Sequence, residues 1–121
     1  MSAANGHKED IHMQVPLQIA MHGIAHSPAL EAEIRERVAK LEAVHPRIIS
    51  CRVAVEEVGR HHQQGRRFEV HIDVRVPGRQ IVVNREQHED VYVALRNAFD
   101  AARRQLEDTA REARGDVKRH E

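Results

Sequence analysis

Three adjacent side chains, His88, Glu89 and Asp90, could together bind a metal ion or move a proton. A metal site on a helix prefers ligands at i, i+3 or i, i+4, and no second histidine stands at such an offset from His88. The three residues directly precede an apolar pattern of helical period that begins at Val91, and side chains in that position cap free backbone amides. We therefore interpret His88 and Asp90 as helix-capping residues, with catalysis or metal binding as the alternative.

Two pairs of histidines are the other candidates for metal binding. His22 and His26 are four residues apart, but Gly23 places a turn between them, so the spacing argument for a helix does not apply. His61 and His62 lie in a polar stretch that predicts a solvated loop. Neither pair predicts a metal site.

Cys51 is the single cysteine, so neither an internal disulfide nor a multi-cysteine zinc site can form within the chain. It is in phase with Ile49 and Val53 in an alternating segment, which predicts a small buried hydrophobic residue with no nucleophilic role. The sequence has no glycine-rich phosphate loop, no G-x-S-x-G motif and no paired-carboxylate pattern. We expect no catalytic residue, no metal, no cofactor and no small-molecule substrate.

Length and composition favour one soluble domain. The chain has 121 residues, of which 40% are hydrophobic and 31% charged, a balance typical of a globular fold. No apolar run approaches the roughly 20 residues that span a bilayer, and the N-terminus lacks the apolar core of a signal peptide. We expect a cytoplasmic protein with no membrane partner, made of a disordered arm (1–13), one α/β domain (14–114) and a flexible tail (115–121).

The charge balance limits how the protein could bind nucleic acid. Lysine plus arginine and aspartate plus glutamate both number 19, so the formal net charge is zero, and a whole-molecule basic footprint is missing. The aromatic residues are Tyr92, Phe68 and Phe99, too few for a platform that stacks several unpaired bases. Any RNA contact must therefore come from a local basic patch.

A first helix is predicted from about Pro28 to Val44. Ser27 can cap its first amides, and proline suits the first helical position. His45 and Pro46 end the helix, because the residue before a proline disfavours helical geometry. Its buried stripe, at helical spacing, is Leu30, Ile34, Val38 and Leu41.

Four segments alternate apolar and polar residues, as strands with one buried face do. Their inward residues are Leu17, Ile19 and Met21; Ile49, Cys51, Val53 and Val55; Phe68, Val70, Ile72, Val74 and Val76; and Ile81 and Val83. Pro77 and Gly78 predict a tight turn before the last segment. The predicted fold is α+β in the order β-α-β-β-β-α. The first two strands pair in parallel, the later strands form an antiparallel meander, and both helices cover one sheet face.

The last helix carries a core face and a charged face. Its core residues, at about 100° per residue, are Val91, Leu95, Ala98, Phe99, Ala102 and Leu106. The arginines of the opposite side are Arg96, Arg103, Arg104, Arg111 and Arg114. Asp100 can pair with Arg104, and Glu107 with Arg103, at i, i+4. This face is therefore either a solvated surface of ion pairs or an RNA-binding surface.

Two sequence segments carry a family resemblance. HEDVYVALRNAFDAARRQL (88–106) and ERVAKLEAV (36–44) resemble the last and first helices of ribosome hibernation-promoting factors, a family also called ribosome-associated inhibitors or sigma-54 modulation proteins. The resemblance covers about residues 15 to 110. It implies a double-stranded-RNA-binding-domain-like fold, with two helices on one face of a four-stranded sheet. It also implies binding to the small ribosomal subunit and its 16S-type RNA in the decoding channel, which would block messenger and transfer RNA during starvation or stationary phase without any enzymatic step.

The resemblance also assigns contacts to ribosomal RNA phosphates. Those carried over by position are Arg37, Lys40, Arg103 and Arg104, and helix geometry adds Arg96 and Arg111. Ala101 and Asp108 stand where relatives commonly carry lysine, and residues 88–114 hold five arginines against six acids. We therefore expect weaker, more salt-sensitive association than in strongly basic relatives.

The chain ends at residue 121 without the linker and second domain of the family's long forms. We expect a short form that inactivates ribosomes directly or assists ribosome dimerisation together with a helper factor. The ten histidines suggest a further hypothesis, in which acidification charges some of them and strengthens the attraction to RNA.

Two other classes of function stay open. The wet face of the sheet, which carries Arg52, Glu69, His71 and Asp73, could serve a protein-interaction module that dimerises or binds a regulator. An enzyme or metalloprotein that uses His88 and its neighbours is the third class.

Overall fold

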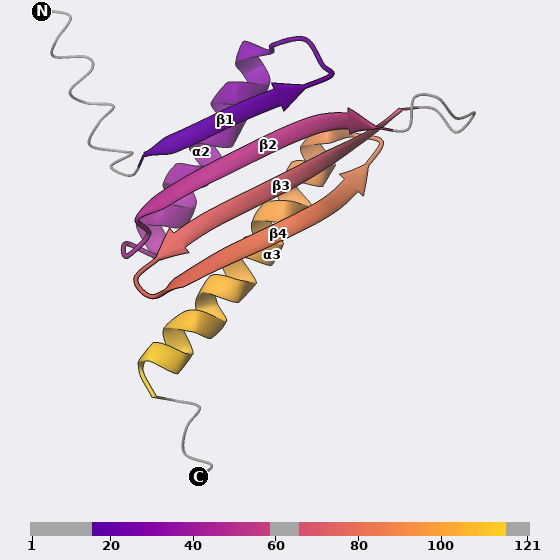
Figure 1. The fold of residues 1–121 in the computed structure, drawn as a ribbon. Coiled ribbons are helices and arrows are strands. Elements are labelled where there is room, and N and C mark those ends of the chain that lie inside the picture. The colour runs from indigo at the N-terminus through magenta and orange to yellow at the C-terminus, as the bar shows by residue number, and fades with distance from the viewer. Residues whose placement is uncertain (1–15, 59–65, 116–121) are drawn as a thin grey trace, which may run out of the picture.

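Six elements of secondary structure make up the fold. The computed structural model describes residues 16–58 and 66–115, and Figure 1 shows them as a sheet with the helices behind it. In chain order the elements are β1 (Leu17–His22), α2 (Pro28–Val44), β2 (Ser50–Val58), β3 (Arg67–Val76), β4 (Arg79–His88) and α3 (Val91–Ala113). The predicted order β-α-β-β-β-α is confirmed. The predicted arm at 1–13, the histidine pair at 61–62 and the predicted tail beyond residue 115 lie outside the described residues.

The strands form one four-stranded sheet in the order β1-β2-β3-β4. β1 and β2 run parallel, as expected for strands joined by a helical crossover, whereas β2-β3 and β3-β4 are antiparallel. Both helices lie on the same face of the sheet (Figure 1). One sheet face is therefore packed, and no helix of the described residues covers the opposite face, called here the outer sheet face.

The core lies between the helices and the packed sheet face, and none of the described polar or charged side chains is buried in it. Both predicted helical stripes take part, and so do the alternating strand residues. The largest fully buried side chains are Ile34, Val38, Val53, Val55, Val70, Ile72, Val74 and Leu95. Leu17, Ile19 and Met21 of the edge strand β1 are partly buried and pack against this cluster.

One inward assignment, that of Ile49, is wrong. Ile49 is 51% exposed, whereas its neighbour Ile48 is 5% exposed and belongs to the core. The reason is that Ile49 precedes β2, in the connection from α2. In that connection the Ile48 amide donates to the His45 carbonyl at 3.3 Å, and Ile48 supplies the apolar side chain that the core takes.

The ends of α2 follow from its capping residues. Ser27 has extended backbone, and its Oγ accepts a hydrogen bond from the Leu30 amide at 3.1 Å. Pro28 stands at the first helical position, where its missing N–H costs nothing. His45 is the C-cap, directly before Pro46. The predicted helix from Pro28 to Val44 is confirmed at both ends.

The start of α3 answers whether His88, Glu89 and Asp90 form a catalytic cluster or a helix start. Asp90 is the N-cap, and its Oδ1 accepts a hydrogen bond from the Tyr92 amide at 2.9 Å. His88 Nδ1 in turn accepts from the Asp90 amide at 2.9 Å. Both side chains are engaged with the backbone of the helix start, so the capping interpretation is confirmed.

The pairing of β3 with β4 contains one irregularity. Gly78 makes the turn between the two strands with φ of 76°, in the left-handed region that favours glycine. Ile72 pairs with Val83, but Val70 pairs with Glu86. Between these two pairs β4 advances by three residues, whereas β3 advances by two. This β-bulge brings Gln87 opposite Glu69 on the outer sheet face.

Candidate nucleic-acid interface

Helix α3 presents arginines on the side opposite its core stripe. On a helical wheel of about 100° per residue, Arg96, Arg103, Arg104 and Arg111 of α3 fall within an arc of about 100°, opposite the core stripe. All four side chains are exposed. With Arg37 and Lys40 of α2 they form the set called here the helix surface.

Most cations of the helix surface already have an acidic partner in their own helix. Arg37 Nε lies 2.8 Å from Glu33, and Lys40 Nζ lies 3.8 Å from Glu36. Arg103 is 3.0 Å from Glu107, and Arg111 pairs with Asp108. These pairs span one helical turn. Three of the four are exposed, whereas the Arg37–Glu33 pair is partly buried, and an exposed ion pair contributes about 0–1 kcal/mol. Their carboxylates are weak competitors that a phosphate can replace.

Arg96 and Arg104 differ from the other four. Within residues 16–58 and 66–115, neither guanidinium has an ion-pair partner. The predicted pair of Arg103 with Glu107 is confirmed, whereas the alternative pair of Asp100 with Arg104 does not form in this part of the chain. Arg96 and Arg104 are therefore the cations of the helix surface that need give up no carboxylate to bind a phosphate.

His45 connects the two helices electrostatically. Its ring Nε2 is buried and has no hydrogen-bond partner among the described residues. Burial lowers the pKa of His45 below its ordinary value of 6.5, the Glu107 carboxylate opposes this shift, and the Arg103 guanidinium adds to it. The end of α2 therefore lies within the electrostatic field of the Arg103–Glu107 pair.

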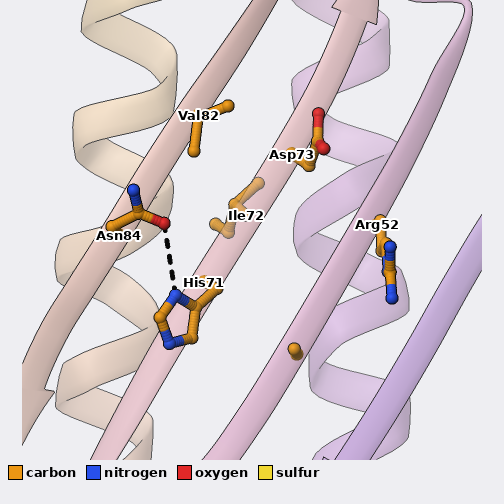
Figure 2. A pocket seen from close by; sticks show the side chains of 7 residues that line it. Arg52, His71, Ile72, Asp73, Val82 and Asn84 are labelled. Atoms are coloured by element: carbon orange, nitrogen blue, oxygen red, sulfur yellow. Dashed lines mark hydrogen bonds between the residues drawn. The ribbon is translucent and has the colours of Figure 1, made fainter.

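The outer sheet face is built differently, from polar side chains that pair across strands. Gln80 Nε2 donates to both carboxylate oxygens of Asp73 at 2.8 and 2.9 Å. His71 Nδ1 lies 3.3 Å from Asn84 Oδ1, and Figure 2 shows this contact beside a hollow of about 240 Å³. Arg52 also lines the hollow. Cross-strand register therefore decides what this face presents.

Cys51 takes no part in either surface. It is 3% exposed and belongs to the core, as its phase with Val53 predicted. Burial, with a smaller contribution from the Asp73 carboxylate, raises the pKa of the thiol to about 12. A thiol protonated at neutral pH is a poor nucleophile and metal ligand.

Comparison with protein families gives a match over most of the chain. The family model described as sigma 54 modulation protein / S30EA ribosomal protein matches residues 17–114. The chain belongs to this family. Membership identifies it as a ribosome-associated protein and confirms the resemblance carried by segments 36–44 and 88–106.

Solved structures support the fold of this S30EA family member. A ribosomal subunit interface protein from Coxiella burnetii is 17% identical, with a TM-score of 0.68 over 79% of this chain and 98% of that one. The N-terminal domain of Protein Y from Thermus thermophilus is 18% identical, with a TM-score of 0.65 over 78% of this chain and 99% of that one. No curated protein sequence matches the chain significantly. Within the described residues, no helix is long and apolar enough to cross a membrane.

The structure places the six sequence-predicted cations of this S30EA protein on two neighbouring helices, α2 and α3. His26 pairs with Glu31 at 2.9 Å. Among the residues that the structure describes, one group of metal-ligand side chains stands close together, namely Glu56, Glu69 and His71. Sequence reasoning missed this group, because no spacing along the chain reveals the register of β2 against β3.

Proposed function

We propose that the protein is a hibernation factor that binds the small ribosomal subunit in the decoding channel and blocks messenger and transfer RNA. The carrying observation is the family match over residues 17–114, in a fold whose two helices present the cations of the helix surface. Phosphate contacts of this kind position a protein on RNA without reading sequence. Steric occlusion then needs no chemical step, only a rigid domain that holds the two helices in register.

The contacts that we assign to ribosomal RNA are Arg37, Lys40, Arg96, Arg103, Arg104 and Arg111. Arg96 and Arg104 meet phosphates first, because they are unpaired within the described residues. The other four exchange a carboxylate on their own helix for a phosphate oxygen. The displaced acids stay nearby and repel the phosphates, so the affinity is lower than six isolated cations would give.

The balance of 19 basic and 19 acidic residues gives this function a clear salt signature. Each phosphate contact on RNA contributes roughly 0.7–0.9 to the slope of log K against log salt. Since the starting affinity is low, binding ends at a lower salt concentration than for a strongly basic relative. A helper factor for ribosome dimerisation is compatible with the same proposal.

The deciding experiment is co-sedimentation with purified small ribosomal subunits across a salt series. The variant R103E/R104E reverses two adjacent cations of the helix surface and should abolish binding at every salt concentration. Its matched control is R52E/R75E, which makes the same charge change at two exposed arginines of the outer sheet face and should keep most of the binding. Circular dichroism spectra that match the unmodified protein would confirm that both variants are folded.

Three other outcomes count against the proposal. Binding by R103E/R104E would show that the helix surface is not the contact. Loss in both variants would show that net charge decides, whichever surface carries it. No binding by the unmodified protein, even at low salt, would favour the second candidate, a dimerising or regulator-binding module. That candidate draws on the outer sheet face, where Val82 is 44% exposed beside the hollow, and sedimentation of the free protein would test it.

A further inference from the structure

The outer sheet face brings together three side chains that are far apart in sequence. Glu56 of β2 pairs directly with Glu69 of β3, so two carboxylates stand opposite each other. His71 lies two residues further along β3, and alternation places it on the same face as Glu69. One ligand atom from each of the three lies within 4.8 Å of the other two.

The contact between His71 and Glu69 has the spacing of two metal ligands. His71 Nε2 lies 3.4 Å from Glu69 Oε1, longer than the roughly 2.7–3.2 Å of a good N–H···O hydrogen bond. Two ligands of a tetrahedral zinc ion with bonds of about 2.0–2.2 Å lie about 3.4 Å apart. Glu56, whose ligand atom lies within 4.8 Å of the other two, reaches the same ion when its flexible side chain moves inward.

Both nitrogens of the His71 ring face an oxygen acceptor. Nδ1 lies 3.3 Å from Asn84 Oδ1, and Nε2 faces Glu69 Oε1. A neutral imidazole has one N–H, so it satisfies one of these acceptors and turns a lone pair toward the other. With Nδ1–H donating to Asn84, the Nε2 lone pair meets a carboxylate oxygen. A cation between Nε2 and Oε1 converts this repulsion into attraction.

The neighbours hold the ligands in the orientation that a metal needs. Gln87 Nε2 donates to Glu69 Oε2 at 3.0 Å, which leaves Oε1 toward His71. Asn84 Oδ1 accepts a hydrogen bond from Nδ1 of His71. Most metal-bound histidines donate their second ring N–H to a neighbouring acceptor in the same way. The bulge in β4 is what brings Gln87 opposite Glu69. The Glu69 side chain is only 13% exposed, so little water competes for it.

We infer that the outer sheet face binds one zinc-class divalent ion through Glu56, Glu69 and His71, with water in the fourth position. One imidazole nitrogen with two carboxylate oxygens is a zinc donor set, whereas magnesium and calcium prefer oxygen alone. This site lies on the face opposite the helix surface and does not depend on ribosome binding. The sequence analysis expected no metal, because the ligands meet only through strand register.

Glu56 gives the site an energetic signature. Within the described residues its carboxylate has no hydrogen-bond or ion-pair partner, and like charges directly opposite across strands are destabilising. E56Q removes that repulsion and a metal ligand together. It should therefore raise the melting temperature of the metal-free protein and shrink the rise in melting temperature that zinc produces.

The test is a titration of the full-length chain with zinc chloride by calorimetry at pH 7.5, with cobalt absorption spectra to report tetrahedral coordination. The variants H71Q, E69Q and E56Q each remove one ligand and should weaken the tightest zinc site by roughly ten-fold or more. H26A is the matched control, because it removes a histidine that pairs with Glu31 instead, and it should bind as the unmodified protein does.

Equal zinc affinity in H71Q and H26A overturns the inference, because other histidines of the chain would then hold the ion. Absence of tight zinc binding by the unmodified protein also overturns it. E56Q keeps the test decisive if H71Q fails to fold, since it replaces one surface oxygen with nitrogen. The site is supported if E56Q raises the melting temperature of the metal-free protein and also weakens zinc binding.

Discussion

The helix surface and the outer sheet face both present charged side chains, but they hold them in different ways. Pairs on the helix surface join residues three or four positions apart in one helix. Pairs on the outer sheet face join residues 7, 13 and 18 positions apart. The first kind rearranges by side-chain rotation alone, which suits exchange with phosphates. The second is fixed by the backbone register, which suits a ligand of defined geometry.

The largest effect should come from the core that supports both surfaces. Leu95 is 0% exposed in α3, and Leu95→Ala should cost about 2–5 kcal/mol of the free energy of unfolding. Urea denaturation measures this loss. Tyr92→Ala, at a residue 42% exposed in the same helix, is the control and should cost far less. Equal losses would mean that the α3 stripe is not the common support of the two faces.

Loss of the N-cap of either helix that carries the helix surface should destabilise the domain. Asp90→Ala removes the N-cap of α3 and should cost about 1 kcal/mol in urea denaturation, and Ser27→Ala should do the same for α2. Glu89 is the neighbour of Asp90, but its side chain is not the N-cap. Glu89→Ala should therefore change the free energy of unfolding by less than about 0.5 kcal/mol. A loss at Glu89 as large as that at Asp90 would contradict the capping role.

Removing acidic residues should strengthen binding to RNA when they belong to the helix surface, but not when they belong to the outer sheet face. E107Q/D108N frees Arg103 and Arg111 from their partners, and it should tighten binding to small ribosomal subunits by up to about five-fold per pair. Asp73→Asn removes an acid from the outer sheet face and should leave that affinity unchanged. The comparison between the faces fails if both changes tighten binding equally.

The smallest effect should appear in the pH dependence at His45. Burial lowers the pKa of His45 below 6.5, so the unfolded chain binds a proton at this ring before the folded protein does. The stability tied to neutral His45 is therefore present above pH 6.5 and is lost as the pH falls through the lowered pKa. The stability of the unmodified protein relative to His45→Asn should decrease between pH 7.5 and 5.5, and a constant difference would contradict the shift.

Local signals predicted most of the fold. The bounds of α2 follow from a capping serine, a proline at the first helical position and a His-Pro step, all readable within a few residues. The stripe of α3 and the inward residues of β2 and β3 follow from periodicity. Ile49 was misplaced because alternation does not show where a strand begins.

The sites were less predictable than the fold, for a physical reason. An i, i+4 pair such as Arg103 with Glu107 is visible in the sequence. The sequence does not show that Arg104 and Asp100 form no ion pair within the described residues. The group of Glu56, Glu69 and His71 depends on the β2-β3 register and on the extra residue in β4. Neither of these leaves a mark in the apolar pattern.

The reactivity of the buried Cys51 thiol can report local opening of the domain. Its thiol is buried beside the first paired residues of β1 and β2, where the Cys51 amide donates to the Pro16 carbonyl at 3.0 Å. A thiol-specific reagent therefore reacts only when this corner of the domain opens. Comparing the labelling rate with the rate of global unfolding would show whether the short edge strand β1 detaches alone, and whether a bound ribosome or a bound ion slows that motion.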